Sequence, residues 1–276
     1  MNYRHAYHAG NFADLVKHAL LLWLLERRVR EDAPLLIVDT HAGSGLYDLG
    51  EGAERSREAR EGIARLMDAP RLPAELAELK MAVRARNGGR DAVRWYPGSP
   101  LLIADALRRG DRYVACELRP EEHERLAERL AGREGVETRQ ADGYEAVMAI
   151  PLQGRRRLVL IDPPFERPDD YVRCAETAGA LTRADPETTV AIWLPIKDME
   201  TFDGFLRRLA GAGVGRALVA EVRLRPLTNP MKMNGCALVM IHPPQGAQAA
   251  ARAVCEWTAT ALGEPGARGE AWWTDA

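Results

Sequence analysis

Short apolar runs alternate with longer stretches of mixed polarity along this 276-residue chain. A short apolar run is typical of a buried strand, and apolar residues three or four positions apart are typical of a helix. The runs predict strands at residues 35–39, 112–117, 136–139, 158–161 and 189–195, and two late strands at about 216–225 and 236–242. The intervening stretches predict helices at 11–30, 56–67, 73–86, 101–109, 120–130, 171–181 and 199–210.

This alternation predicts an α/β fold with an open, mainly parallel sheet and right-handed crossovers. The two late strands face each other across the turn-rich residues 226–230, so the last strand should run antiparallel. Residues 48–96 exceed what one crossover needs, and we expect them to form an inserted helical subdomain. The whole chain, residues 1–276, then forms a single domain around one sheet.

Polar residues follow four of the predicted strands. They are Asp39 with the turn glycines Gly43 and Gly45, then Glu117, then Asp142 with Gly143, and finally Asp162. Because ligands of open α/β sheets bind at the carboxyl ends of the strands, we expect these residues to share one site.

The composition, with 46% hydrophobic and 28% charged residues, is that of an ordinary globular chain. The apolar run at residues 19–25 is far shorter than the roughly 20 residues a spanning helix needs, and no secretory signal is recognisable. We therefore expect a cytoplasmic protein without a membrane segment. Its four cysteines form no C-x-x-C pair, so neither a metal site nor a disulfide framework is expected.

Net charge limits how the protein can bind nucleic acid. A formal charge of −2 and a pI near 6.3 argue against a broad basic surface, so contact with phosphates must be local. Residues 53–94 hold ten basic and seven acidic side chains, and residues 1–30 hold five basic and two acidic ones. Each segment thus carries +3, although solvated helix faces rich in i,i+4 pairs explain these charges at least as well.

The motif Asp162-Pro163-Pro164-Phe165 is the most informative part of the sequence. Two prolines cannot donate to a sheet, so the strand ends at Asp162 in a rigid turn that presents a carboxylate, a carbonyl and an aromatic face together. Such a trio suits an exocyclic base amine, whose two N–H groups are accepted by Asp162 and the Pro163 carbonyl while Phe165 stacks on the ring. Amino-methyltransferases carry this signature, and a bland strand-terminating turn is the alternative.

The glycine turn admits two cofactors. A dinucleotide-binding turn needs a third glycine where this chain has Asp48, and an acid about 20 residues further on. S-adenosylmethionine needs a glycine turn for its methionine half and acids for its ribose and adenine. Gly43 with Gly45, Glu117 and Asp142 meet those needs in order, which favours S-adenosylmethionine.

The chain resembles the RlmJ family of 23S ribosomal RNA adenine-N6-methyltransferases. The motifs that carry the resemblance are HAGNFAD at 8–14, KH at 17–18, DTHAGSG at 39–45, YPGSP at 96–100, DG at 142–143 and LIDPP at 160–164. The resemblance implies a Rossmann-like methyltransferase with a helical insertion, S-adenosylmethionine as cofactor, and one adenine of large-subunit RNA as target.

The resemblance also implies roles for individual residues. Implied cofactor contacts are His18, His41, Ser99, Glu117, Asp142, Gly143 and Asp162, and the residues implied to bear on catalysis are Tyr3, His5, Lys17 and Asp162. The family usually has tyrosine where this chain has Phe165, so the resemblance implies stacking there without a hydroxyl.

Most of these residues also have simpler explanations. His18 could pair with Asp14 on a surface, His41 could bond within its own turn, Lys17 could serve the helix dipole, Ser99 could be an N-cap, Glu117 could be a solvated strand end, and Tyr3 and His5 could belong to a frayed tail. The second Pro-Pro pair, in His242-Pro243-Pro244, lacks the carboxylate and the aromatic, so we interpret it as a strand-terminating turn.

These observations predict N6-methylation of a specific adenine in 23S ribosomal RNA by a monomeric enzyme acting on free RNA before subunit assembly. A DNA adenine-N6-methyltransferase is the alternative enzyme, although such enzymes normally need a larger recognition region than residues 48–96 provide. The other alternative is a non-catalytic RNA-binding module, which the intact strand-end residues argue against.

Overall fold

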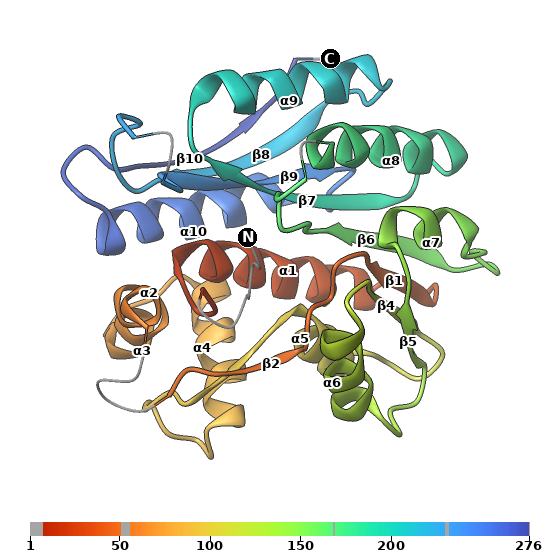
Figure 1. The fold of residues 1–276 in the computed structure, drawn as a ribbon, viewed down its shortest axis with the longest axis horizontal. Helices are drawn as coiled ribbons and strands as arrows, with labels where there is room; N and C mark the ends of the chain where they lie inside the picture. Colours follow the sequence, from red (N-terminus) through yellow and green to blue (C-terminus); the bar gives the residue numbers. More distant parts are fainter. Residues whose placement is uncertain (1–7, 51–55, 168, 230–231, 276) are drawn as a thin grey trace.

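The computed structural model describes residues 8–50, 56–167, 169–229 and 232–275. Its strands are β1 (Leu35–Asp39), β2 (Leu46–Asp48), β3 (Trp95–Pro97), β4 (Arg112–Glu117), β5 (Val136–Gln140), β6 (Arg156–Ile161), β7 (Thr189–Ile196), β8 (Ala217–Arg223), β9 (Gly235–Ile241) and β10 (Arg268–Trp273). Eight of them form one sheet in the order β10-β8-β9-β7-β6-β1-β4-β5, and β2 pairs with β3 in a separate ribbon (Figure 1).

Helices cover both faces of the large sheet. They are α1 (Phe12–Val29), α2 (Arg57–Ala59), the π-helical turn η3 (Arg60–Ala64), α3 (Arg65–Asp68), α4 (Ala74–Arg86), α5 (Ser99–Ala106), α6 (Pro120–Leu130), α7 (Gly143–Ala149), α8 (Asp170–Ala184), α9 (Met199–Gly211) and α10 (Ala247–Leu262). Leu35 and Ile37 of β1 belong to the core under α1, α5 and α10, whereas Leu36 and Val38 belong to the core under α7, α8 and α9. Successive side chains of a strand point to opposite faces, so both cores need an unbroken apolar run, as the sequence shows.

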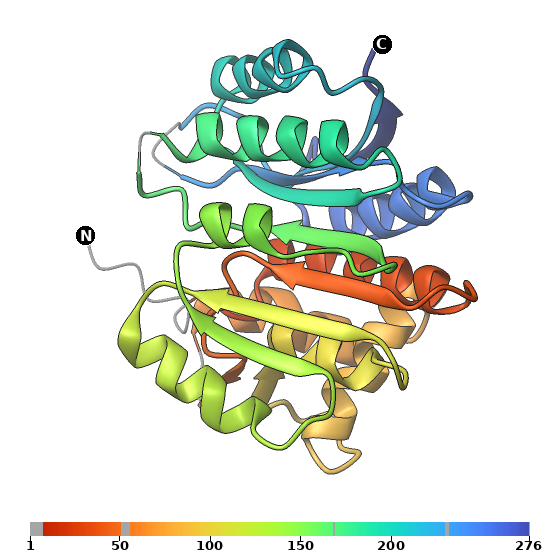
Figure 2. The ribbon, with the colours of Figure 1, turned by 90° about the vertical axis from the view of Figure 1, so that its right-hand side faces the viewer.

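The sheet has a parallel half and an antiparallel half. Strands β5, β4, β1, β6 and β7 pair in parallel, and Figure 2 shows strands of this half pointing the same way. Strand β9 runs antiparallel to both β7 and β8, which confirms a mainly parallel sheet with a reversed late strand. The structure adds β10, antiparallel to β8, and three further elements absent from the prediction: α7, α10 and the β2-β3 ribbon. The buried face of α10 recurs every three or four residues but consists mainly of alanine, and the strand β10 has mixed polarity, so neither contains a run of large apolar residues.

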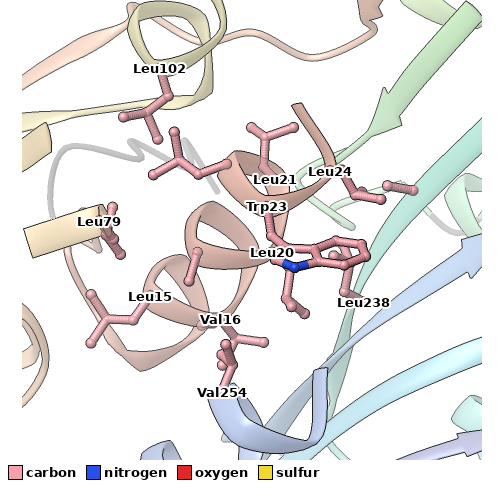
Figure 3. Packing of buried hydrophobic residues seen from close by; sticks show 14 of the residues in the cluster. Leu15, Val16, Leu20, Leu21, Trp23, Leu24, Leu79, Leu102, Leu238 and Val254 are labelled. Atoms are coloured by element: carbon pink, nitrogen blue, oxygen red, sulfur yellow. The ribbon is translucent and has the colours of Figure 1, made fainter. Parts of the chain in front are cut away.

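Helix α1 is buried on all sides over most of its length, residues 12–25. In Figure 3 it is surrounded by Leu79 of α4, Leu102 of α5, Leu238 of β9 and Val254 of α10. A helix enclosed in this way brings its polar side chains inside as well. Lys17 therefore enters the interior with an exposed fraction of only 4%.

Residues 48–96 leave and return at neighbouring points, because Asp48 of β2 pairs with Trp95 of β3. The segment between them packs against the start of α1: the Ile63 N–H donates to the Gly10 carbonyl at 2.8 Å. A β-carbon at Gly62 would lie 2.3 Å from that carbonyl oxygen, so only glycine allows this approach. The helices of the segment thus share their apolar core with α1.

No helix of the described residues is long and apolar enough to cross a membrane. Within the same residues, no three histidine, cysteine or acidic side chains gather as metal ligands would. The four cysteines are buried free thiols.

Candidate active site

The register of the parallel strands aligns their polar ends. Asp39 at the end of β1 lies opposite Ala115 of β4 and Leu160 of β6, two residues before Glu117 and Asp162 respectively. Glu117 in turn lies opposite Gln140 of β5, two residues before Asp142. The four predicted acids therefore reach one edge of the sheet, because the carboxyl ends of parallel strands meet there.

Lys17 links α1 to the end of β6. Its Nζ donates to Oδ2 of Asp162 at 2.6 Å and lies 3.0 Å from Oδ1 of Asp14, one helical turn earlier. Burial lowers the pKa of Lys17, but the two carboxylates outweigh this and hold the pKa well above its usual value. The ammonium is therefore charged at neutral pH, and its role is that of an internal ion pair rather than a helix-dipole charge.

Asp39 is fully buried beside this pair. Its Oδ2 accepts the Ser99 hydroxyl at 2.7 Å, and its Oδ1 accepts the His41 N–H at 3.3 Å. Burial, helped by the charge of Asp162, raises the pKa of Asp39 to about 7, although both hydrogen bonds oppose the shift. The alternative explanation of Ser99 as the N-cap of α5 was wrong: Gly98 is the N-cap, and the Ser99 hydroxyl donates to Asp39 instead.

Glu117 closes the glycine turn. Its Oε2 accepts the Gly43 N–H at 2.9 Å and its Oε1 accepts the Arg119 N–H at 2.8 Å, which fixes the carboxylate against two loops. Gly43 and Gly45 have φ of +63° and +83°, and a β-carbon at Gly43 would lie 2.5 Å from the Tyr47 hydroxyl. The turn therefore needs glycine at position 43. Burial raises the pKa of Glu117 despite its backbone donors.

Asp142 begins α7 as its N-cap, accepting the Tyr144 N–H at 3.0 Å. The Arg173 guanidinium of α8 also grips both of its oxygens. Burial raises the pKa of Asp142, but Arg173 more than reverses this and the pKa lies below its usual value. A β-carbon at Gly143 would lie 1.9 Å from the Thr40 carbonyl, so glycine is what lets α7 start against the end of β1.

The two histidines implied as cofactor contacts, His18 and His41, lie in different surroundings. His18 is buried, and its Nδ1 lies 2.7 Å from the Tyr96 hydroxyl, so it is not part of a surface pair. His41 is partly exposed and its Nδ1 lies 2.8 Å from Oγ1 of Thr40, within its own turn. Although the residue is partly exposed, the protein shields most of the ring from water, and this desolvation lowers the pKa of His41 to about 4, so the ring is neutral at physiological pH.

The turn after β6 presents Phe165 with φ of +49°, a left-handed conformation that is uncommon for a residue with a side chain. Its half-buried ring lies 4.7 Å from the Tyr171 ring and 6.0 Å from the Trp193 ring, measured between centroids. Trp193 also lies 6.0 Å from Nζ of Lys17. Pro163 is buried and Pro164 is exposed, so one side of the turn packs against the protein and the other faces solvent.

The structure brings together Lys17 with Asp162, Ser99 with Asp39, and Glu117 with Gly43. Tyr3 and His5 lie outside the described residues. Sequence reasoning missed four residues that touch the predicted ones: Asp14, Tyr96, Trp193 and Arg173. Asp14 and Tyr96 left a signal: Asp14 lies three residues from Lys17 on one helix face, and Tyr96 begins the YPGSP motif at residues 96–100.

Comparison with known proteins identifies the family of the chain. The family model described as "Ribosomal RNA large subunit methyltransferase D, RlmJ" matches residues 32–274. Proteins named ribosomal RNA large subunit methyltransferase J from Haemophilus influenzae and Escherichia coli are 33% and 34% identical, each over 88% of both chains. A crystal structure of the Legionella pneumophila protein LPL1258 superposes with a TM-score of 0.86, is 30% identical, and covers 98% of both chains. The chain belongs to the RlmJ family and is an S-adenosylmethionine-dependent methyltransferase.

Proposed function

We propose that the protein methylates the N6 amine of one adenine in 23S ribosomal RNA, and that it acts on free RNA before the subunit assembles. The observation that carries the proposal is Asp162 at the end of β6, held 2.6 Å from Lys17 and followed by Pro163, Pro164 and Phe165. The names of the relatives support ribosomal RNA as the substrate. We also propose that residues 48–96 act as an inserted subdomain beside this site, and that the enzyme works as a monomer.

The glycine turn and the strand-end acids fit S-adenosylmethionine. Gly43 leaves no side chain where the turn passes Glu117, and each Glu117 oxygen, with one backbone donor, keeps a lone pair for a ribose hydroxyl. We assign the methionine half to the turn with Gly45, His41 and Ser99, and the adenine to Asp142 and Gly143. When bound, the cofactor supplies a methyl group already activated by the sulfonium.

Orientation of the target amine is then the main task of the protein. Lys17 occupies Oδ2 of Asp162, and no described residue donates to Oδ1, which is open to one N–H of the amine. The Pro163 carbonyl accepts the second N–H. Two accepted hydrogen bonds favour a tetrahedral nitrogen, whose lone pair is less delocalised into the ring and points at the methyl group.

Lys17 has a second consequence for the reaction. Because Asp14 and Asp162 hold its pKa well above the usual value, it remains an ammonium and cannot serve as the base. A carboxylate is far too weak to deprotonate a neutral amine beforehand, so proton loss accompanies or follows methyl transfer. The ion pair keeps Asp162 in place as an acceptor.

The test is incubation with labelled S-adenosylmethionine and three substrates: protein-free large-subunit RNA lacking the modification, assembled large subunits, and duplex DNA. We expect N6-methyladenine in the free RNA, less label in assembled subunits, and much less in DNA. The Asp162→Ala variant is the control for adventitious label. Methylcytosine as product, or a preference for DNA, would overturn the proposal.

A further inference from the structure

Arg173 of α8 joins two of the predicted cofactor contacts, although nothing in the sequence marks it. Its Nη1 lies 2.9 Å from Oδ2 of Asp142 and its Nη2 lies 3.0 Å from Oδ1, a bidentate pair that fixes the plane of the carboxylate. The same guanidinium lies over the Tyr144 ring, 4.3 Å from its centroid. The side chains of Arg173 and Asp142 are about one-fifth exposed, so the pair is only partly open to solvent.

Tyr144 extends the contact to the glycine turn. Its ring meets the His41 ring edge-on at 4.8 Å and 70°. Its hydroxyl lies 3.4 Å from Asp170 and 3.5 Å from the sulfur of Cys174, the buried residue next to Arg173. Cys174 therefore anchors α8 in the core beside Arg173, and the Arg173 guanidinium contacts Asp142 directly and the Tyr144 ring, which in turn meets His41.

We propose that Arg173 is a positioning residue that holds the Asp142 carboxylate toward the exocyclic amine of the cofactor's adenine. This inference rests on the assignment of Asp142 to that adenine under the proposed function. The Tyr144 N–H, which Oδ1 of Asp142 accepts as an N-cap, still leaves the carboxylate some rotation about its last bond, whereas a planar five-donor fork matched to both oxygens restricts it to one orientation. Lysine cannot replace the fork, because an ammonium is a point charge.

Two ligands separate positioning from a merely structural clamp. S-adenosylhomocysteine carries the adenine amine, and S-inosylhomocysteine carries a carbonyl oxygen in its place, which a carboxylate rejects. Their dissociation constants are measured by calorimetry for the wild type and for Arg173→Lys, Arg173→Gln, Asp142→Asn and Arg183→Gln. Arg183 lies on the same helix and bonds the Ala212 carbonyl, so its variant removes one charge without touching the site.

We expect Arg173→Lys and Arg173→Gln to bind S-adenosylhomocysteine about 10-fold more weakly, the lower end for a charge-assisted hydrogen bond. Binding of S-inosylhomocysteine should stay at the wild-type level, which also shows that the variants are folded. The preference for S-adenosylhomocysteine over S-inosylhomocysteine should therefore fall in the Arg173 variants as it does in Asp142→Asn. Arg183→Gln should keep the wild-type preference.

The other outcomes overturn the proposal in distinguishable ways. Equal losses for both ligands would make Arg173 a structural clamp, and tighter binding of S-adenosylhomocysteine would mean that Arg173 competes with the adenine. If Asp142→Asn loses the preference and the Arg173 variants keep it, only the role of Arg173 fails. If Asp142→Asn keeps it, the assignment of Asp142 fails too. None of these readouts depends on the RNA, so a failure of the methylation proposal appears separately.

Discussion

Two strands of the same sheet end in a pair of prolines, β6 at Asp162-Pro163-Pro164 and β9 at His242-Pro243-Pro244. Both turns contain a residue in the left-handed region, since Phe165 and His242 each have φ of +49°. The two turns lie at opposite ends of the strands, because β9 runs antiparallel to β7 and β7 runs parallel to β6. The same dipeptide therefore ends a strand at the candidate active site in one case and away from it in the other.

The partners of the two turns differ accordingly. At β6 the partner is the ammonium of Lys17, which leaves Asp162 an oxygen free of described donors. At β9 the His242 carbonyl accepts from Arg28 and from the Thr189 hydroxyl, and its Nδ1 lies 3.1 Å from the Thr188 carbonyl. Those hydrogen bonds satisfy backbone carbonyl groups at the end of the sheet. A Pro-Pro turn thus ends a strand, and whether the turn can bind a ligand depends on the end of the sheet at which it lies.

Replacing Asp162 should have the largest effect on activity. Asp162→Ala should cut methyl transfer by more than about 100-fold, as expected for a group that orients the reacting amine. The fold should survive, because Lys17 keeps Asp14 as its partner. Single-turnover rates with free RNA and thermal unfolding measure the two effects.

The matched control is His242→Ala in the other turn. It removes one side-chain hydrogen bond, which costs about 1 kcal/mol of unfolding free energy, and should leave the rate within about twofold. Retention of more than about a tenth of the rate in Asp162→Ala, or a comparable loss in His242→Ala, would erase the functional distinction between the turns.

Removing Lys17 should affect both stability and rate. Lys17→Met leaves the buried Asp14 without its cation, and breaking a buried pair costs about 3–5 kcal/mol. Adding Asp14→Asn should restore much of that stability but not the rate, because Asp162 still lacks its support. Denaturant unfolding and rate measurements on the single and double variants decide this. Recovery of both quantities together would make Lys17 a purely structural residue.

The strand ends could be predicted from sequence because each apolar run stops at an acid and the parallel register aligns the stops. The position of Lys17 could not be predicted in this way. Its contact with Asp162 spans 145 residues and depends on α1 being enclosed by α4, α5, α10 and β9. Ser99 shows the same limit: its serine-proline pair is a good N-cap signal, but its hydroxyl donates to a buried carboxylate 60 residues away in the sequence.

Phe165 and His242 occupy the same left-handed position in the two turns, and substitutions of Phe165 test whether its ring holds the target base. Phe165→Ala should weaken RNA use about 5- to 150-fold, the loss of one base-stacking contact worth about 1–3 kcal/mol, and Phe165→Tyr should be nearly neutral. Affinity for S-adenosylhomocysteine should be kept in both variants, as calorimetry would show. A matching loss of cofactor affinity would mean that the ring only supports the turn through Tyr171 and Trp193. A harmless alanine would mean that the base is held elsewhere.

The smallest expected effect is on the pH dependence of stability. Asp39 lies close to Asp162, and its titration tests whether the two carboxylates influence each other. Its pKa of about 7 in the folded protein lies above the value of 3.8 for an ordinary aspartate. Between those values the folded state binds more protons than the unfolded state, so the contribution of Asp39 to stability falls as pH rises through this window and levels off above about 7. Asp39→Asn cannot titrate, and its amide can still meet Ser99 and the His41 N–H. Relative to that variant, the wild type should lose about 1.4 kcal/mol of unfolding free energy between one pH unit below and one above the folded pKa. Denaturant unfolding at both pH values measures the difference, and a constant difference would show that Asp39 does not titrate under the influence of Asp162.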